Sequence, residues 1–455
     1  MTMNIRIPEN VQYLIDTLES HGFEAYAVGG CVRDGLMGAV PKDWDICTPA
    51  RPQQTARLFA AHPMHNAGIQ HGTVSVILDH QPYEITTYRV DGGYSDHRRP
   101  DAVSFVGSLR EDLSRRDFTV NAMAYHPRRG LVDPFGGEAD LRAKIIRCVG
   151  DADGRFREDA LRVMRALRFA ATLGFSIEPG TSEAIFRNQD LLRSIAAERI
   201  AAELSRLLTG DGVQAVLLDY APVLGVVIPE INAMTGFEQN NRYHHLDVWR
   251  HTAAAVAAAA GRGPDDTVLR LAVLLHDIAK PSCYTETDGV GRFHGHQKAG
   301  AVMAGDILRR LRYDNRTVRA VTRLVLYHDA PIPSGGKGVK RWLNRLGEDL
   351  FRLLLEVKKA DVQAHAPWCR AELLAELGRA SDTLEEVMAQ RQCFQLKDLA
   401  VNGRDLIALG VPEGAAIGGV LGQLMELVLD ERLENERESL LEAARRVYAR
   451  DGEGF

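Results

Sequence analysis

The chain has 455 residues, of which 45% are hydrophobic and 25% are charged, and it carries a formal net charge of −6. This length predicts roughly three or four domains with a sizeable buried core, and the acidic balance excludes a surface coated in positive charge for tight non-specific nucleic-acid binding. No apolar run approaches the ~18–20 residues that a membrane span needs, and residues 1–11 show no signal-peptide pattern. Six cysteines without a CxxC pair predict free thiols in a reducing cytoplasm, and exclude a disulfide framework or a zinc knuckle.

Residues 1 to about 145 alternate between helical and strand patterns. Gly29-Gly30 has the composition of a turn between a strand and a helix, and the Gly-, Asp- and Arg-rich residues 92–100 predict a loop. We expect helices over residues 8–22 and 32–37, and strands over residues 24–28, 44–46, 74–78 and 83–90.

From about residue 155 the pattern becomes helical, with apolar residues at three- and four-residue spacing, and the strand pattern does not return strongly. We expect helices over residues 156–173, 181–188, 197–208, 212–220, 253–260 and 268–278, and a further helical array to the end of the chain. The predicted fold class is therefore α+β, with a mixed head followed by an all-α body. The predicted domains are residues 1–150, 151–235, 236–370 and 371–455.

Three acidic side chains in the head predict a metal site. Asp43 and Asp45 flank Trp44, and in a strand residues i and i+2 point to the same face. Two adjacent carboxylates repel each other unless a cation lies between them, and magnesium is bound by such carboxylates together with substrate phosphates. Glu84, on a later predicted strand, is a candidate third carboxylate. A pair of magnesium ions held in this way can stabilise both oxygens of a phosphoryl transfer.

The turn upstream of these carboxylates fits a phosphate. Glycine lets the backbone approach a ligand closely, and the start of the following helix supplies N–H donors. Arg33 lies one turn into that helix, where its guanidinium can reach a triphosphate oxygen.

Residues 28–34 (VGGCVRD), followed by Asp43-Trp44-Asp45, resemble the head of polymerase-β-type nucleotidyltransferases. More narrowly, they resemble the bacterial CCA-adding enzymes and their poly(A) polymerase relatives. Residues 91–100 (DGGYSDHRRP) are similar to the flexible loop of that family, residues 113–122 (LSRRDFTVNA) to its RRD motif, and residues 157–169 (REDALRVMRALRF) to its nucleotide-reading motif. Cys31 departs from the usual Ala or Ser at a position that supplies mainly backbone. The resemblance implies nucleotide-binding roles for Gly30, Arg33, Arg116, Asp159, Arg162, Arg165 and Arg168.

The nucleotide-reading motif has a physical basis. Cytosine and adenine each present an amino donor beside a ring-nitrogen acceptor, so a carboxylate and a guanidinium together complement both bases. Asp159 and Arg162 are three residues apart on one expected helix, close enough to form such an edge. Arg165 and Arg168 are rotated further around that helix, and we assign them to phosphate or to holding Asp159. Asp117 and Asn121 are expected to support Arg116.

The flexible loop bears on whether the final A is added. The resemblance implies that this loop helps the family switch from C to A. The chain retains a polar and aromatic loop, which favours full CCA addition over CC addition alone; its residues are Asp91, Tyr94, Asp96, Arg98 and Arg99.

The body contains a second candidate metal site. His251, then His276-Asp277, then Asp361 follow the order of ligands in the HD phosphohydrolases, which they resemble. Imidazole and carboxylate ligands from separate helices can hold a divalent metal with open positions for water. His294, His296 and His328 lie between them along the chain. The alternatives are a site that hydrolyses phosphoesters, such as a 2′,3′-cyclic phosphate on a damaged tRNA end, and a structural relic.

The last part of the chain resembles the tRNA-gripping tail of long family members, over residues 399–406 and 418–435. The charged run 431–450 fits either a solvated helical face or an RNA contact. Altogether the resemblance implies magnesium-dependent CCA addition to tRNA from CTP and ATP, with no DNA or membrane partner. The alternatives are a poly(A) polymerase, a CC-adding enzyme, an HD phosphohydrolase with a relic head, and a non-catalytic tRNA-binding factor.

Overall fold

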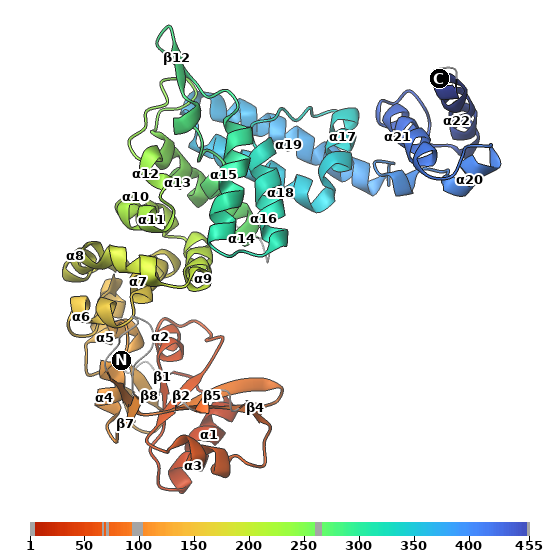
Figure 1. The fold of residues 1–455 in the computed structure, drawn as a ribbon. Coiled ribbons are helices and arrows are strands. Elements are labelled where there is room, and N and C mark those ends of the chain that lie inside the picture. Colours follow the sequence, from red (N-terminus) through yellow and green to blue (C-terminus); the bar gives the residue numbers. More distant parts are fainter. Residues whose placement is uncertain (1–4, 66–67, 70–71, 93–102, 260–265, 453–455) are drawn as a thin grey trace. The chain divides into compact units, whose positions relative to one another are not determined.

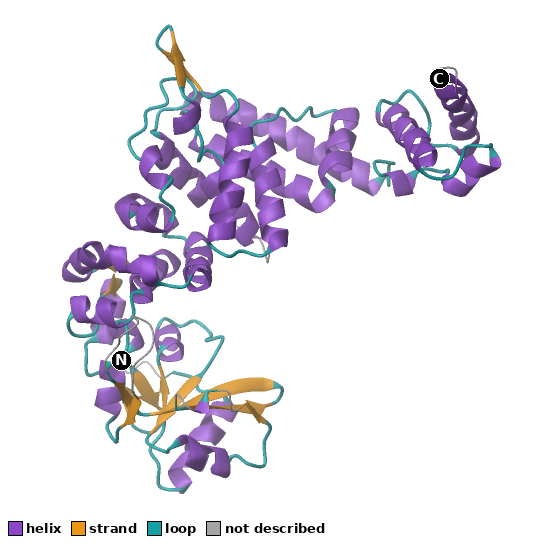
Figure 2. Cartoon of the chain, in the orientation of Figure 1, coloured by secondary structure: helices purple, strands orange, loops and turns teal. Residues whose placement is uncertain are grey.

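The computed structural model describes residues 5–65, 68–69, 72–92, 103–259 and 266–452. It divides into two compact units. The first unit comprises Met1–Asn232 with Arg310–Tyr313, and the second comprises Ala233–Arg309 with Asp314–Phe455. The first unit contains a β-sheet with helices, whereas the second is built almost entirely of helices (Figure 2). Among the described helices, none combines the length and apolar character needed to traverse a bilayer.

The head of the first unit is organised around a seven-stranded mixed sheet with the strand order β3-β4-β5-β2-β1-β8-β9. Only β2 and β5 run parallel to each other among these neighbours, and every other neighbouring pair is antiparallel. The strands are β1 (Tyr26–Val28), β2 (Asp45–Thr48), β3 (Met64–His65), β4 (Thr73–Leu78), β5 (Gln81–Thr87), β8 (Ala124–His126) and β9 (Gly130–Val132). A separate antiparallel pair is formed by β6 (Arg89–Asp91) and β7 (Val103–Phe105).

Helices cover both faces of this sheet. Figure 1 shows α1 (Glu9–Ser20) and α3 (Pro52–Leu58) on one face and α2 (Gly30–Leu36) on the other. The buried side chains of α1 recur at three- and four-residue spacing, which is the amphipathic pattern of a helix that packs on a core. The head is completed by α4 (Leu109–Ser114), the short 3-10 helix η2 (Thr119–Asn121) and α5 (Gly137–Ala143).

The rest of the first unit is helical and also contains the short parallel pair β10 (Ile145–Ile146) and β11 (Ser176–Ile177). The predicted continuous helix over residues 156–173 is wrong, because the chain forms two helices that break at Asp159 and Ala160. The helices are α6 (Ala152–Glu158), α7 (Leu161–Leu173), α8 (Pro179–Asn188), α9 (Ala197–Leu208), α10 (Val213–Asp219), α11 (Ala221–Val227) and α12 (Ile231–Met234, which crosses the division between the units).

The second unit begins with a bundle in which α13 packs against α18. One β-hairpin interrupts its helices, contrary to the expected all-α body, with strands β12 (Thr285–Thr287) and β13 (Val290–Arg292). The bundle helices are α13 (Val248–Ala258), α14 (Asp266–Leu275), α15 (His296–Arg310), α16 (Asn315–Tyr327), α17 (Gly336–Leu346), α18 (Glu348–Ala364) and α19 (Pro367–Ala389).

The C-terminal part of the second unit has a hydrophobic core of its own. Leu406, Leu424 and Leu440 are fully or almost fully buried there, and each comes from a different helix. The helices are α20 (Gly403–Ala408), α21 (Ala415–Leu429) and α22 (Arg437–Gly452). As predicted, all six cysteines of the chain are free thiols.

Candidate active site

The head sheet brings two of the predicted carboxylates together. Asp45, the first residue of β2, lies directly opposite Glu84 of β5 in a parallel register, so both side chains leave the same face of the sheet. Asp43 precedes the strand, contrary to the expectation that both aspartates share it, yet its charge still acts on Asp45. All three side chains are accessible to solvent. Although Asp45 is accessible, protein atoms packed around its carboxyl reduce its hydration, and this desolvation together with the charge of Glu84 raises the pKa of Asp45 to about 6. A divalent cation bound by these crowded carboxylates would relieve their mutual repulsion.

The glycine turn lies beside these carboxylates. Val28, at the end of β1, pairs with Asp45, so Gly29 and Gly30 follow directly next to it. Gly29 has a φ of +84°, and a Cβ at this position would lie 3.1 Å from Nη1 of Arg116. Gly29 is therefore required both by its backbone conformation and by the close approach of a guanidinium. A Cβ at Gly30 would meet Arg33 Nη2 at 3.7 Å, an ordinary contact distance.

Arg116 supplies a partly buried positive charge to this site. Its Nη2 lies 3.4 Å from Asp112 Oδ2, and its charge also acts on Asp45. Nε of Arg116 is buried without a hydrogen-bond partner among the described residues. The expected support of Arg116 by Asp117 and Asn121 is wrong, because Asp112 takes that place.

Asp117 and Asn121 instead join two other predicted arginines in one buried network. Arg33 donates from Nη1 to Asn121 Oδ1 at 2.7 Å, and Asn121 Nδ2 donates to Asp117 Oδ1 at 3.2 Å. Arg165 donates to Asp117 Oδ2 through Nε at 2.8 Å and through Nη2 at 2.5 Å. Burial alone would raise the pKa of Asp117, but Arg165 and the hydrogen bonds lower it to about 2. The network therefore fixes Arg33 from α2 relative to Arg165 from α7.

An aromatic ring organises the guanidiniums further along α7. Phe169 has the Cζ atoms of Arg33, Arg165 and Arg168 at 5.2, 5.5 and 3.7 Å from its ring centre. Arg168 also donates from Nε to Glu203 Oε2 at 2.5 Å. A cation is attracted to the face of an aromatic ring, so Phe169 helps to hold three like charges close together. The sequence patterns did not single out either Phe169 or Glu203.

Asp159 and Arg162 do not share one helix, although a backbone hydrogen bond joins them, in which the N–H of Arg162 donates to the carbonyl oxygen of Asp159 at 2.9 Å. Asp159 has an extended backbone between α6 and α7, and Arg199 of α9 donates to both of its oxygens, at 3.4 and 3.0 Å. Arg162 donates to Glu158 Oε2 at 2.6 Å. The residue that holds Asp159 is therefore Arg199 and neither Arg165 nor Arg168. Arg199 could have been suspected only as a cation on the helix that packs against α7.

The second unit gathers the predicted histidine and aspartate residues from several helices. His251 of α13 has Nε2 at 2.9 Å from Asp361 Oδ1 of α18, and His276 Nε2 lies 3.5 Å from the same oxygen. Asp277 Oδ2 lies 3.1 Å from His276 Nε2. The four residues of the expected metal site are therefore brought together. His294 is exposed and belongs to none of the groups of described residues that could hold a metal ion.

Further histidines complete this histidine cluster, which comprises His244, His251, His276, Asp277, His296, His328, Asp361 and His365. His296 Nε2 and His328 Nε2 each lie 3.6 Å from Asp277 Oδ1. Among the described residues, three groups could each hold an ion: the first is His251, His276 and Asp361, the second is Asp277, His296 and His328, and the third is His244, His251 and His365. The rings of His276, His296 and His328 are oriented by backbone carbonyls at 2.7 Å from Nδ1, which leaves Nε2 to face the cluster.

The chemistry of the histidine cluster fits a divalent metal. Neither oxygen of the buried Asp277 accepts a well-aligned hydrogen bond from the described residues, although Lys280 Nζ lies 2.7 Å from Oδ2. His276 Nε2 is also buried and has no hydrogen bond to the part of the chain that the structure describes. Burial alone would lower the pKa of His276, but Asp277 and Asp361 raise it to about 10. A pocket of about 440 Å³ adjoins the cluster, and its lining includes His328, Asp361, His365, Lys358 and Arg379.

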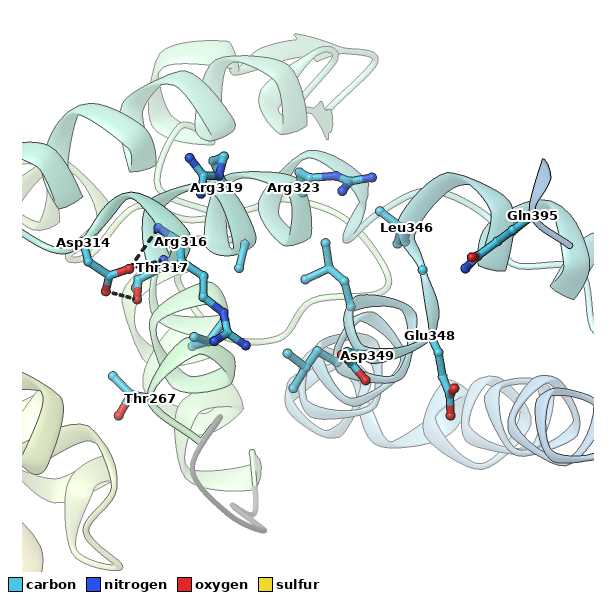
Figure 3. Close-up of a pocket in the computed structure, with 15 residues that line it drawn as sticks. Thr267, Asp314, Arg316, Thr317, Arg319, Arg323, Leu346, Glu348, Asp349 and Gln395 are labelled. Carbon is cyan, nitrogen blue, oxygen red and sulfur yellow. Dashed lines mark hydrogen bonds between the residues drawn. The ribbon is translucent and has the colours of Figure 1, made fainter. Parts of the chain in front are cut away.

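A larger hollow of about 920 Å³ lies elsewhere on the second unit (Figure 3). Arg316, Arg319 and Arg323 of α16 line it, and so do the acidic side chains of Glu348 and Asp349. Asp314, at its edge, caps α16 by accepting hydrogen bonds from the backbone N–H groups of the first turn. Because the lining carries both positive and negative side chains, it favours neither an anionic nor a cationic ligand, and we do not assign an active site to this hollow.

One predicted element lies mostly outside the described residues. Tyr94, Asp96, Arg98 and Arg99 of the flexible loop are not among them, and of Asp91 only the backbone, the last residue of β6, is described.

Three family models match the chain in succession. They are the poly A polymerase head domain over residues 25–147, the probable RNA and SrmB-binding site of polymerase A over residues 174–234, and the putative tRNA nucleotidyltransferase domain 2 over residues 297–444. The first match contains the carboxylates, the glycine turn and Arg116.

Individual relatives extend the similarity over nearly the whole chain. The CCA-adding enzyme of Levilactobacillus brevis is 38% identical over 442 residues, which is 96% of this chain and 97% of that protein. The CCA-adding enzyme of Geobacillus stearothermophilus is 34% identical over 439 residues, 96% of this chain and 94% of that protein. The crystal structure of Bacillus stearothermophilus CCA-adding enzyme in complex with CTP aligns with a TM-score of 0.72 at 29% identity, covering 98% of this chain and 100% of that chain. These findings confirm the α+β fold class and the resemblance of the head motifs. The chain belongs to the family of CCA-adding enzymes and is a nucleotidyltransferase.

Proposed function

We propose that this chain adds C, C and A to the 3′ end of tRNA, using CTP and ATP, by phosphoryl transfer at Asp43, Asp45 and Glu84. The observation that carries the proposal is the register of β2 and β5, which sets Asp45 against Glu84 beside the Gly29 turn and Arg116. We assign residues 1–150 to the catalytic head and residues 151–235 to the reading of the nucleotide. Residues 236–370 form the body and residues 371–455 the tail that grips tRNA.

Magnesium fits the carboxylates of the head. Asp43, Asp45 and Glu84 would hold the ions, since desolvation and then the negative charges of Glu84 and Asp43 raise the pKa of Asp45, and a bound cation would offset those charges. Bound magnesium supplies neutralisation of the triphosphate and activation of the attacking 3′-hydroxyl. Arg116 adds a fixed positive charge beside the same carboxylates, and Gly29 leaves the backbone open to a phosphate.

We assign the choice of base to Asp159 as the hydrogen-bond acceptor and Arg162 as the donor. Arg199 positions Asp159, and Glu158 positions Arg162. Asp159 already accepts from Arg199 and from the backbone N–H of Leu161, at 3.1 Å. A carboxylate has about four acceptor sites, so capacity remains for the amino group of cytosine or adenine. Guanine or uracil would leave a buried polar group unpaired, at a cost of about 1–3 kcal/mol. Gly30, Arg33, Arg165 and Arg168 are assigned to the rest of the nucleotide.

The direct test is the extension of a tRNA that lacks its last three nucleotides, with CTP and ATP supplied singly and together. The relatives support CCA addition, since the structure of the Bacillus stearothermophilus enzyme is a complex with CTP. A CC-adding enzyme and a poly(A) polymerase are distinguished from it by product length.

A second activity is favoured by the histidine cluster. We propose that His251, His276, Asp277 and Asp361, together with His296 and His328, hold divalent metal and hydrolyse phosphoesters, such as a 2′,3′-cyclic phosphate on a damaged tRNA end. Asp277 links two of the ligand groups, since its Oδ1 faces His296 and His328 of its own group, whereas its Oδ2 lies 3.1 Å from Nε2 of His276 in another. Bound metal would supply a nucleophilic water at neutral pH. Lys358 and Arg379, which line the adjoining pocket, would attract the phosphate.

This second proposal is tested by titrating the full chain with manganese and measuring binding by calorimetry. Asp277→Ala should abolish binding at the cluster, whereas Asp43→Ala should leave that binding phase in place. If Asp277→Ala keeps every manganese-binding phase of the unaltered chain, the metal site is refuted. Hydrolysis of RNA ending in a 2′,3′-cyclic phosphate is then compared in the same two variants.

A further inference from the structure

Two aromatic side chains and an arginine are stacked on the surface of the second unit. The rings of Tyr243 and Trp368 have centroids 5.5 Å apart and are tilted by 32°. The Arg242 Cζ lies 4.8 Å from the Tyr243 ring centre and 5.6 Å from that of Trp368. We call Arg242, Tyr243 and Trp368 the aromatic platform.

The platform is held in place from the backbone. Trp368 Nε1 donates to the carbonyl oxygen of Arg242 at 3.1 Å, and the N–H of Ala366 donates to the carbonyl of Tyr243 at 2.8 Å. Arg242 Nη2 donates to the Tyr243 hydroxyl at 2.6 Å. The segment before α13 and the start of α19 are therefore tied together, and the rings keep their relative positions without being buried.

The platform is unusually exposed for its composition. Trp368 is 59% exposed and Tyr243 is 40% exposed, and Arg242 is also exposed. Large aromatic side chains are buried on average, and neighbouring exposed rings mark sites of interaction more often than single ones do. If the rings served only to pack α19 against the preceding loop, most of the Trp368 surface would be covered.

The platform directly adjoins the histidine cluster. Tyr243 precedes His244, whose ring centroid lies 4.7 Å from that of His365 and 4.8 Å from that of His251. Trp368 follows His365 by three residues, a span of at most about 11 Å even in an extended chain. A base that stacks on the platform is therefore close enough for a phosphate of the same or the next nucleotide to reach the histidine cluster.

We propose that the aromatic platform stacks an unpaired base at the end of an RNA whose phosphate is presented to the histidine cluster. This inference rests on the proposed phosphohydrolase activity and names its substrate class as a single-stranded RNA end. Every base has a flat face that stacks on an aromatic ring whatever its sequence, and an arginine beside the rings adds attraction for the phosphate backbone. A phosphate ester without a base would use the metal ligands and make no use of the platform.

Intrinsic fluorescence tests the stacking without relying on catalysis. The chain has four tryptophans, and Trp368 is the exposed one, since Trp44, Trp249 and Trp342 are 7%, 2% and 6% exposed. The full chain is titrated with a single-stranded RNA pentanucleotide, and the Trp368→Phe variant gives the signal of the other three tryptophans for subtraction. This subtraction matters because Trp44 lies between Asp43 and Asp45 in the head.

We expect saturable quenching that depends on Trp368. Tyr243→Ala should weaken the apparent affinity of that phase by about 5- to 100-fold, the range expected for the loss of one stacked base. A blunt RNA duplex of equal charge should not quench Trp368. The proposal is overturned if the Trp368-dependent quenching is absent, is unchanged in Tyr243→Ala, or is equally strong with the blunt duplex.

A second measurement separates this proposal from the proposed phosphohydrolase activity. Trp368→Ala should raise KM at least about fivefold for RNA that ends in a 2′,3′-cyclic phosphate, while Trp368→Phe restores it. Hydrolysis of p-nitrophenyl phosphate, which has no nucleobase, should be unchanged. If the unaltered chain hydrolyses neither compound, the phosphohydrolase assignment fails, and the quenching result still decides the stacking. An equal loss on both substrates in Trp368→Ala would overturn the base-stacking role.

Discussion

Asp45 and Glu84 lie directly opposite each other on the parallel strands β2 and β5, and this pairing concentrates negative charge at one point of the head sheet. The proposed chemistry depends on this relationship. Asp45→Ala should lower the rate of nucleotide addition by about 10²–10³-fold or more, because the charge that would hold the metal is lost. Binding of tRNA, measured by filter retention, should survive. Asp79→Asn is a matched control, since Asp79 is an exposed acid between β4 and β5 of the same sheet. Comparable activity in Asp45→Ala and Asp79→Asn would contradict the assignment.

The raised pKa of Asp45 predicts how magnesium demand varies with pH. Because burial and Glu84 raise this pKa to about 6, the carboxylate is charged above pH 6 and increasingly protonated below it. A protonated carboxyl is a poor ligand, so the magnesium concentration for half-maximal activity should rise as the pH falls from 7.5 to 5.5. Below about pH 6, the increase in this magnesium concentration should approach tenfold for each further pH unit. A constant magnesium requirement across this range would count against Asp45 as a ligand.

Because Arg199 contacts Asp159, we expect Arg199 to affect the choice of base without touching the base. Arg199→Ala should release the Asp159 carboxylate and lower the preference for CTP over UTP by about 5- to 100-fold, as we also expect of Asp159→Ala directly. The affinity for triphosphate should change less than the selectivity. The measurement is single-nucleotide incorporation with each triphosphate alone. Arg206→Ala, an exposed arginine later on α9, is the control and should leave selectivity unchanged.

Asp117 should contribute to stability in a pH-dependent way. Its pKa of about 2 in the folded chain is below the ordinary value of 3.8, so its stabilising effect is fully present well above pH 4 and is lost as the pH falls towards 2. Asp117→Asn should lower the free energy of unfolding of the first unit by about 2 kcal/mol at pH 7. The difference between the two proteins should shrink below about pH 4. Urea denaturation at pH 7, 4 and 3 measures this, and a difference that grows on acidification would contradict the ion pair with Arg165.

The head was predictable from the sequence because its signals are local. Gly29-Gly30, Asp43 and Asp45 lie within one strand-turn-helix-strand segment, and Glu84 follows on a strand with a clear composition. The break between α6 and α7 was missed because residues 156–173 keep a helical spacing throughout. The side chain of Asp159, however, accepts the backbone N–H of Leu161, the first residue of α7, so Asp159 lies before the second helix where it was expected to continue the first.

Local sequence patterns could not predict which residues contact the predicted site residues. Arg199 meets Asp159, and Glu203 meets Arg168, across the packing of α7 on α9, which no local pattern specifies. His296 and His328 likewise join Asp277 only through the packing of separate helices. Histidines without fixed spacing carry no signal until the fold brings their Nε2 atoms together.

The most direct test of the central claim is extension of a tRNA that lacks its last three nucleotides, resolved at single-nucleotide length. With CTP alone we expect growth by two nucleotides, and with CTP and ATP together growth by three followed by arrest. Arrest after two nucleotides in the presence of both triphosphates would indicate a CC-adding enzyme, and a long ladder with ATP alone would indicate a poly(A) polymerase. No growth under any condition would contradict nucleotidyl transfer by this chain and leave the histidine cluster as its active site.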